Sequence, residues 1–176
     1  MSIPLQARSG AWQPALELLE PISLVRCCTS PLGRNLCMIV TETAVHVYAT
    51  SDESPNLSFE PVTSFFLGCR ATGASWSPST QHASTAWRIE ILVATETNEL
   101  RLLESVRQGS EASTSNIKLA DTYARVTDLA WCASPGYESY AAAACSDGTV
   151  RLWDLEGGCR THYLNSAVLS VAFHPK

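Results

Sequence analysis

A strand–turn–strand plan that occurs three times limits the fold of this chain more than any other feature. Residues 37–48, 89–103 and 139–155 each contain two short β-prone runs joined by turn residues. This pattern is typical of a β-hairpin. A further strand signal that ends in a proline turn precedes each hairpin, so the whole unit repeats. The recurrence predicts an all-β repeat architecture.

The length of the repeat is measured from the aromatic residue before each proline turn. Trp76 and Trp131 lie about 55 residues apart and Trp131 and Phe173 about 42, against about 40–45 for WD-type propeller blades. We interpret the polar residues 106–115 in the longer interval as a surface loop without strand character. Two further insertions are expected, at residues 79–86 inside the second unit and at 50–57 between the first and second units.

The third unit carries the signature of a WD repeat within ACSDGTVRLWDL, residues 144–155. Asp147 and Gly148 suit the tight turn between two strands, because glycine accepts a positive φ and aspartate tolerates it. Trp153 offers a large apolar surface. Asp154 can accept hydrogen bonds from the turn that follows. A Trp-Asp pair that closes the third copy of a repeated unit favours a WD-repeat β-propeller.

The repeats depart from the ideal WD pattern. The first and second units have Val47-Tyr48 and Leu102-Leu103 in place of Trp-Asp, and the third has Asp121-Thr122 in place of the usual Gly-His. We therefore expect divergent blades that packing holds together.

The predicted fold is all-β, an incomplete WD-repeat β-propeller with about three blades and the first strand of a fourth. Residues 1–23 form a lead-in segment, in which the run at 15–20 fits a short helix and a strand equally well. Residues 24–176 form the propeller, with blades at about 24–50, 58–105 and 117–158 and the next beginning at 164–176. Because propellers close with about 4–8 blades, we expect a longer protein or an element that covers the open edge.

Composition excludes several function classes. The net charge is −5 and the pI about 5.3, with no basic run, which argues against binding to nucleic acid or an anionic membrane. No apolar run reaches the ~20 residues that span a bilayer, and no signal peptide is recognisable, so we expect no membrane insertion and an intracellular protein. The seven cysteines are an odd number without CxxC spacing, which favours reduced thiols over a metal site.

No catalytic pattern emerges, so we expect neither an enzyme nor a cofactor or metal. GxSxG, HExxH and GxxxxGK[ST] motifs are missing from the sequence. Glu96, Glu99 and Glu104 fit a solvated sheet edge better than an acid–base pair. Trp12 stands in a polar context and is a candidate anchor for a protein partner, since tryptophan is enriched at binding hot spots.

Five segments in order, at residues 68–79, 99–103, 124–131, 146–156 and 164–175, resemble the small WD-repeat nucleoporins of the Y-shaped outer-ring scaffold of the nuclear pore complex. The resemblance covers about residues 60–176. It implies a structural subunit at the nuclear envelope that binds the large nucleoporin in the short arm of the Y and neighbouring subunits, supports transport of protein and mRNA, and has no catalytic residues. A generic WD-repeat adaptor that recruits peptides to a ubiquitin-ligase or chromatin complex is the alternative.

Overall fold

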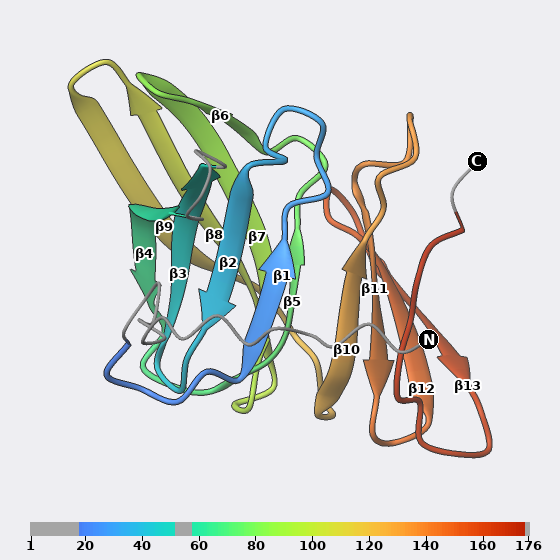
Figure 1. The fold of residues 1–176 in the computed structure, drawn as a ribbon. Helices are drawn as coiled ribbons and strands as arrows, with labels where there is room; N and C mark the ends of the chain where they lie inside the picture. Colours follow the sequence, from blue (N-terminus) through green and yellow to red (C-terminus); the bar gives the residue numbers. More distant parts are fainter. Residues whose placement is uncertain (1–17, 52–57, 175–176) are drawn as a thin grey trace, which may run out of the picture.

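A computed structural model describes residues 18–51 and 58–174, which form three antiparallel β-sheets (Figure 1). The first sheet contains β1 (Leu24–Cys27), β2 (Leu36–Val40), β3 (Ala44–Ser51) and β4 (Ser58–Phe66). The second contains β5 (Ala71–Trp76), β7 (Ala86–Thr95), β8 (Glu99–Gln108) and β9 (Glu111–Asp121), with the short β6 (Gln81–Ala83) paired to β7. The third contains β10 (Val126–Trp131), β11 (Tyr140–Cys145), β12 (Thr149–Asp154) and β13 (Cys159–Tyr163).

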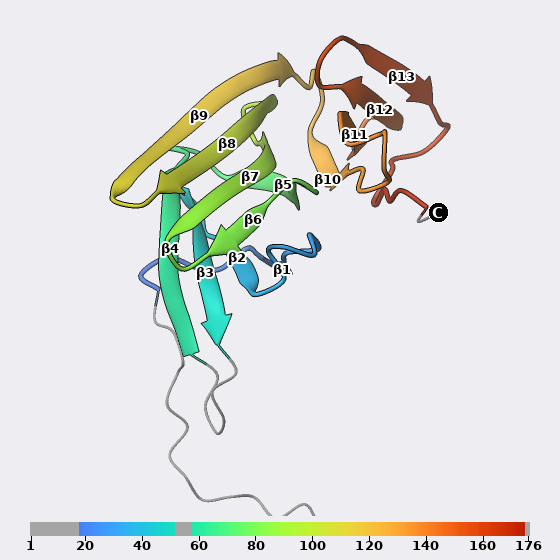
Figure 2. The same ribbon diagram turned by 90° about the horizontal axis from the view of Figure 1, so that it is seen from above.

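The three sheets stand side by side as blades do, with the first strand of each on the inner side (Figure 2). Within each sheet the main strands pair in chain order, from β1 to β4, from β5 to β9 and from β10 to β13. The inner strands β5 and β10 are in contact. Gly73 of β5 allows this approach, since a Cβ there would lie 3.2 Å from the Cβ of Leu129 on β10.

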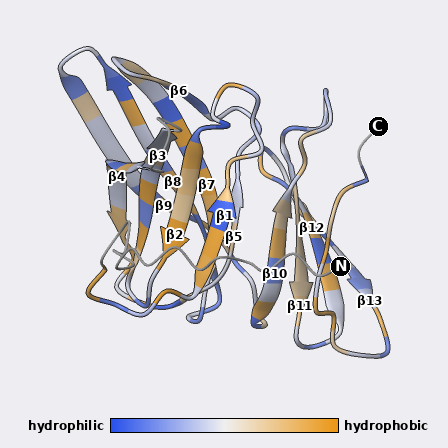
Figure 3. Ribbon diagram, in the orientation of Figure 1, coloured by the Kyte–Doolittle hydropathy of each residue, from blue (hydrophilic) through white to orange (hydrophobic). Residues whose placement is uncertain are grey.

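Apolar side chains fill the spaces between the sheets. Strand β7 is buried on both faces: Ile91 and Val93 pack with the first sheet, while Leu92 and Ala94 pack with the third. A strand between two layers must be apolar at every position, which explains the uninterrupted run in its second half. The apolar colour in Figure 3 accordingly gathers on inner strands such as β1 and β2.

The three predicted hairpins are confirmed as β2–β3, β7–β8 and β11–β12. Their register identifies equivalent positions, because Tyr48 pairs with Cys37, Leu103 with Ile91 and Trp153 with Ala141. The Trp-Asp position is therefore held by Tyr48-Ala49 in the first sheet and by Leu103-Glu104 in the second. The positions expected from the sequence lie one residue too early, because the β2–β3 and β7–β8 turns have no Asp-Gly to fix the register.

The interpretation of residues 106–115 as a loop was wrong. Strand β8 continues to Gln108, a tight turn with positive φ at Gly109 follows, and β9 runs from Glu111 to Asp121. Strand β9 lies at the sheet edge and is exposed at nearly every position. Serine and threonine are tolerated there because the ladder to β8 satisfies the backbone while both faces meet water. The apolar alternation that reveals a strand is consequently missing.

The hydrogen-bonded sheets divide the chain differently from the predicted blades. Strand β4 pairs with β3, so residues 58–66 complete the first sheet, and Thr50 and Ser51, expected in an insertion between two units, belong to β3. Likewise β9 and β13 complete the second and third sheets, which end at residues 121 and 163. Each sheet thus has an outer strand that the sequence pattern missed. The insertion at 79–86 contains β6, which forms a small hairpin with β7.

Residues 164–174 form no strand, contrary to the expected start of a fourth blade. The segment nevertheless runs beside β10: Val168 N donates to the Cys145 carbonyl, and the Thr127 hydroxyl donates to the Val168 carbonyl. A strand is defined by pairing with a neighbour, and no described strand lies beyond this segment. In the lead-in, Leu18–Glu20 forms neither helix nor strand, and residues 1–17, 52–57 and 175–176 lie outside the described part of the chain.

Candidate functional site

The turn between β11 and β12 is built around the Asp147 carboxylate. Oδ1 of Asp147 accepts hydrogen bonds from Thr149 N at 3.0 Å and from the Thr149 hydroxyl at 2.6 Å. The Arg151 guanidinium lies 3.6 Å from Oδ2. The hydroxyl hydrogen bond, above all, lowers the pKa of Asp147, which therefore stays ionised and keeps accepting.

Gly148 follows in the same turn and adopts a φ of +83°. A Cβ at this position would lie 2.9 Å from the carbonyl oxygen of Leu164. Leu164 N also donates to the Gly148 carbonyl at 2.7 Å. The glycine is thus required both for the left-handed backbone and for the close passage of the chain after β13.

Trp153 and Asp154 lie at the other end of β12, so the structure does not bring the four signature residues together. The Trp153 side chain is buried against the second sheet. Asp154 organises the next turn, where its Oδ1 accepts from Glu156 N at 3.2 Å and its backbone pairs with Gly157 and Gly158. All four signature residues therefore shape the third sheet, two at each end of one strand.

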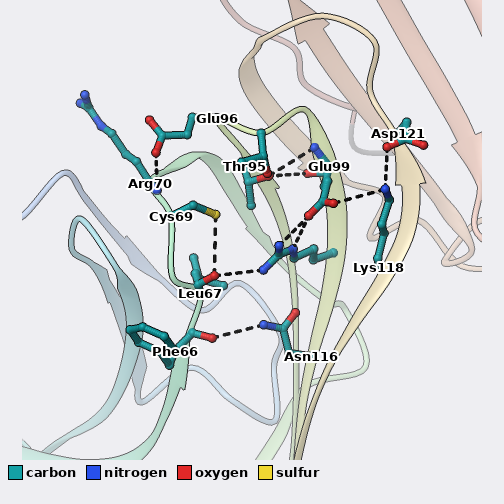
Figure 4. A network of polar contacts seen from close by, with 12 residues as sticks. Phe66, Leu67, Cys69, Arg70, Thr95, Glu96, Glu99, Asn116, Lys118 and Asp121 are labelled. Carbon is teal, nitrogen blue, oxygen red and sulfur yellow. Dashed lines mark hydrogen bonds and ion pairs between the residues drawn. The ribbon is translucent and has the colours of Figure 1, made fainter.

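A polar network lies at the start of β8, the position that corresponds to the Asp147 turn before β12 (Figure 4). It links the second sheet to the first. Arg101 donates twice to Glu99 and once to the Leu67 carbonyl, the latter at 3.1 Å. Lys118 bridges Glu99 and Asp121. Hydrogen bonds from Arg101 and Lys118 lower the pKa of Glu99, and those to Asp121 and Glu99 raise the pKa of Lys118. The ion pairs thus lie within the second sheet, and Arg101 links them to the segment that follows β4.

A groove of about 530 Å³ lies between β9 and the outer part of the third sheet. We call it the rim groove. Apolar side chains and three carboxylates line it together. The lining includes Leu100, Leu119, Asp121, Tyr123, Arg151, Trp153, Asp154, Leu155, Glu156 and Cys159.

Exposed apolar side chains mark the β9 side of the rim groove. Leu119 is 37% exposed and Tyr123 is 81% exposed. Ile117, two residues before Leu119 on the same strand, is 49% exposed. The Arg151 guanidinium lies 5.5 Å from the centre of the Tyr123 ring. An exposed tyrosine beside apolar surface is typical of protein–protein contacts.

Sequence reasoning missed the rim groove. Tyr123 follows β9 and meets Arg151 of β12 only because two sheets lie side by side. The signal available in the sequence is the pair Ile117 and Leu119, which stand two apart in a Ser- and Thr-rich stretch. Two residues two positions apart share a face only in a strand, so the pair indicates an exposed apolar surface only once β9 is recognised as a strand.

The described residues hold no group of three or more His, Cys, Asp or Glu side chains placed to bind a metal. Of the acidic cluster, Glu104 faces Arg88 at 3.6 Å and Glu96 accepts from Arg70 N, both on the surface of the second sheet. No helix within residues 18–51 and 58–174 has the length and apolarity to cross a bilayer. Trp12, the candidate partner anchor, lies outside the described residues.

Comparison with protein families finds no family model that matches the chain. Among curated proteins, the chain is similar to nucleoporin Nup37 of Mus musculus, with 28% identity over 122 residues, which are 68% of this chain and 36% of Nup37. It is also similar to the activating molecules in BECN1-regulated autophagy protein 1B and 1A of Danio rerio, at 43% and 45% identity over 49 residues. That match covers 26% of this chain and 4% of each relative. The chain thus spans about a third of the length of Nup37.

Among solved structures, the WD40 domain of SCAP from fission yeast superposes with a TM-score of 0.59 at 13% sequence identity. The match covers 82% of this chain and 32% of that domain. It confirms the predicted fold class, a WD-repeat β-propeller of which this chain supplies a part. The sequence comparison confirms the predicted resemblance to the WD-repeat nucleoporins.

Proposed function

We propose that this chain, a Nup37-like WD40 protein, is a structural subunit of the outer ring of the nuclear pore complex. The observation that carries the proposal is the 28% identity to Nup37 over 68% of the chain. In this role the protein acts by binding other proteins, at the nuclear envelope, and supports nucleocytoplasmic transport through the scaffold that it helps to build. Its partners are the large nucleoporin in the short arm of the Y and neighbouring Y-complex subunits.

The rim groove is the proposed contact surface for the large nucleoporin. Tyr123 offers an exposed aromatic ring, and Leu119 and Leu155 add apolar surface beside it. Three carboxylates and one guanidinium line the groove. The groove therefore fits a partner segment with apolar side chains and a net positive charge, since opposite charges speed association and fix orientation.

Affinity purification of the tagged protein at endogenous levels, followed by mass spectrometry, tests the proposal. We expect other Y-complex subunits in fixed ratio to the tagged chain. Tyr123→Ala should lower their recovery about tenfold, the effect of losing one contact of ~1.4 kcal/mol. Tyr163→Ala is the matched control, because Tyr163 is 82% exposed on β13 and lies outside the groove lining. Equal losses of Y-complex subunits in both variants would reject the groove as the contact surface. Co-purified partners that include no nucleoporin would reject the proposed function.

The same experiment tests the N-terminal segment and its tryptophan. Residues 1–23 are proposed as a segment that precedes the propeller and adds a partner contact through Trp12. Trp12→Ala should then lower recovery of one partner without changing the thermal stability of the chain. Unchanged recovery would assign no binding role to that tryptophan.

A WD-repeat adaptor is the second candidate function. The 43–45% identity over 49 residues to the activating molecules in BECN1-regulated autophagy protein 1B and 1A supports a WD-repeat role outside the nuclear pore. An adaptor of this class exchanges peptide partners rather than remaining in one assembly. Recovery of ubiquitin-ligase or histone-modifying subunits, with no nucleoporin, would select this function over the first.

A further inference from the structure

Two cysteines face each other across the inner hairpin of the first sheet. Cys27 on β1 and Cys37 on β2 are direct cross-strand partners in the antiparallel register. Both are free thiols. None of the remaining cysteines has a cysteine opposite it in the described ladders: Cys145 pairs with Val126, and Cys159 pairs with Trp153.

The ladder places this pair where a disulfide can form. Cys28 N donates to the Leu36 carbonyl at 2.9 Å, which makes Cys28 and Leu36 a hydrogen-bonded pair. The neighbouring Cys27–Cys37 pair is then of the non-hydrogen-bonded kind, in which the Cα atoms approach to about 4.5 Å and the side chains are nearest. Disulfides span Cα separations of about 4.4–6.8 Å. The register of the two strands therefore suits a cross-strand disulfide.

The two thiols differ in access. Cys27 is exposed to solvent, whereas Cys37 is 5% exposed in a cluster with Ile39 and Tyr48. Burial raises the pKa of Cys37, and the neighbouring Cys27 thiol raises it further. Cys37 thus stays protonated and shielded until its partner has reacted. Oxidant from solvent therefore reaches Cys27 before Cys37.

We propose that Cys27 and Cys37 form a redox-sensitive dithiol, which a low-molecular-weight disulfide such as glutathione disulfide converts into a cross-strand disulfide. The Cys27 thiolate attacks one sulfur of glutathione disulfide, its S–S bond breaks, and one glutathione thiolate leaves. Cys37 then loses its proton to solvent and attacks the Cys27 sulfur, which releases the second glutathione. Two protein thiols are oxidised to one disulfide, and one glutathione disulfide is reduced to two glutathione molecules.

The bond would fix the strand that ties the first sheet to the other two. Strand β1 has only four residues, and β2 is its only neighbour within the sheet. Arg26, adjacent to Cys27, donates to Asp128 of the third sheet at 2.8 Å. The Arg26 carbonyl also accepts from the Trp76 indole of the second sheet. Oxidation thus stabilises the register of the strand that makes both contacts.

Oxidation of the purified full chain with glutathione disulfide tests the proposal. After acid quenching and alkylation, peptide mass spectrometry should show a Cys27–Cys37 disulfide, a loss of two hydrogen atoms from the peptide pair. Exposed Cys159 is the internal control, and it should stop at a glutathione adduct because Trp153 lies opposite it. In Cys37→Ser, Cys27 should stop at the same adduct, whereas Cys159→Ser should leave the Cys27–Cys37 disulfide unchanged.

Two outcomes would overturn the inference. One is a glutathione adduct on Cys27 of the unmodified protein, with Cys37 still open to alkylation. The other is a bond from Cys27 to its sequence neighbour Cys28. Circular dichroism of each variant checks that the sheets are intact. Amide exchange at Cys28, whose N–H donates to the Leu36 carbonyl, should slow in the oxidised chain and stay unchanged in oxidised Cys37→Ser, a readout that does not depend on the proposed function.

Discussion

The two interfaces between neighbouring sheets are filled in different ways. Between the first and second sheets, large aliphatic side chains come from both sides, for example Met38 and Val45 against Ile91. Between the second and third sheets, β11 contributes small residues such as Ala141, β10 contributes Leu129, and β12 contributes the buried ring of Trp153. Packed sheets keep a spacing of about 10 Å. The two interfaces therefore differ most at the WD position of β8 and β12, where the first interface has a leucine and the second has a tryptophan.

Cross-strand pairing explains where the tryptophan is needed. Trp153 lies opposite Ala141, whereas the equivalent Leu103 lies opposite Ile91. A large and a small side chain fill about the same space as two medium ones, and close packing requires that the total volume be kept. The WD tryptophan is thus dispensable in the second sheet because its cross-strand neighbour is larger.

Truncating the buried ring of Trp153 should have the largest effect. Trp153→Ala is expected to cost about 3–5 kcal/mol of unfolding free energy, because the small residues around it cannot close the cavity. Urea denaturation followed by circular dichroism measures the loss. Ile91→Val, in the interface that shares its volume among many side chains, should cost only about 1 kcal/mol. Similar losses for the two variants would remove the proposed difference between the interfaces.

Substitutions in the two turns that flank β12 should have the next largest effect on the unfolding free energy, and the two turns should differ. Gly148→Ala is expected to cost about 2–3 kcal/mol, because φ is +83° and the new Cβ would meet the Leu164 carbonyl at 2.9 Å. Gly158→Ala is the control, since a Cβ at that position would have no neighbouring atom within 4 Å. Thermal unfolding of both variants decides the matter. A Gly148→Ala protein as stable as Gly158→Ala would contradict the described turn.

Asp128 joins the first and third sheets, so its substitution should weaken the structure in a pH-dependent way. Burial raises the pKa of Asp128, but hydrogen bonds from Val171, Ser170, Leu129 and Arg26 outweigh it and lower the pKa overall. A lowered pKa adds stability above the unfolded value of about 4, and that stability is lost as the pH falls through the folded pKa. Asp128→Asn should cost about 1.5 kcal/mol at neutral pH.

The pH profile is the decisive part of this prediction. Denaturation of the unmodified and Asp128→Asn proteins between pH 7 and about 3 should give a difference that shrinks at the acidic end. A difference that is independent of pH would mean that the carboxylate charge contributes nothing to the contact.

The smallest effect on stability is expected at the rim groove. Tyr123→Ala should change the unfolding free energy by no more than about 0.5 kcal/mol, because the ring is 81% exposed. Thermal unfolding beside the binding assay separates the two roles of the residue. A large loss of stability would make Tyr123 part of the interface between sheets rather than a contact for a partner.

The strands with apolar side chains were predicted from the sequence, and the outer strands with mostly polar side chains were missed. The three central hairpins were found because their strands alternate or are buried on both faces, as in residues 89–94. The outer strands β9 and β13 were missed because edge strands expose both faces, so no periodicity appears. The predicted blade boundaries differ from the observed sheet boundaries for the same reason.

The candidate site was less predictable than the fold. The positive φ of Gly148 and the burial of Trp153 follow from local sequence. The rim groove and the Arg26–Asp128 contact join residues of different sheets, and only the packing of the sheets brings them together. The Cys27–Cys37 pair could have been inferred from the sequence, had the register around the turn between β1 and β2 been fixed first.

The location of the protein in living cells shows whether it is a structural subunit of the nuclear pore. The protein, fluorescently tagged at its own locus, should concentrate at the nuclear rim and recover slowly after photobleaching, as expected for a stably bound scaffold subunit. Tyr163→Ala should behave identically, and Tyr123→Ala should shift the signal toward a diffuse pool. A diffuse or purely cytoplasmic signal for the unmodified protein would contradict the account.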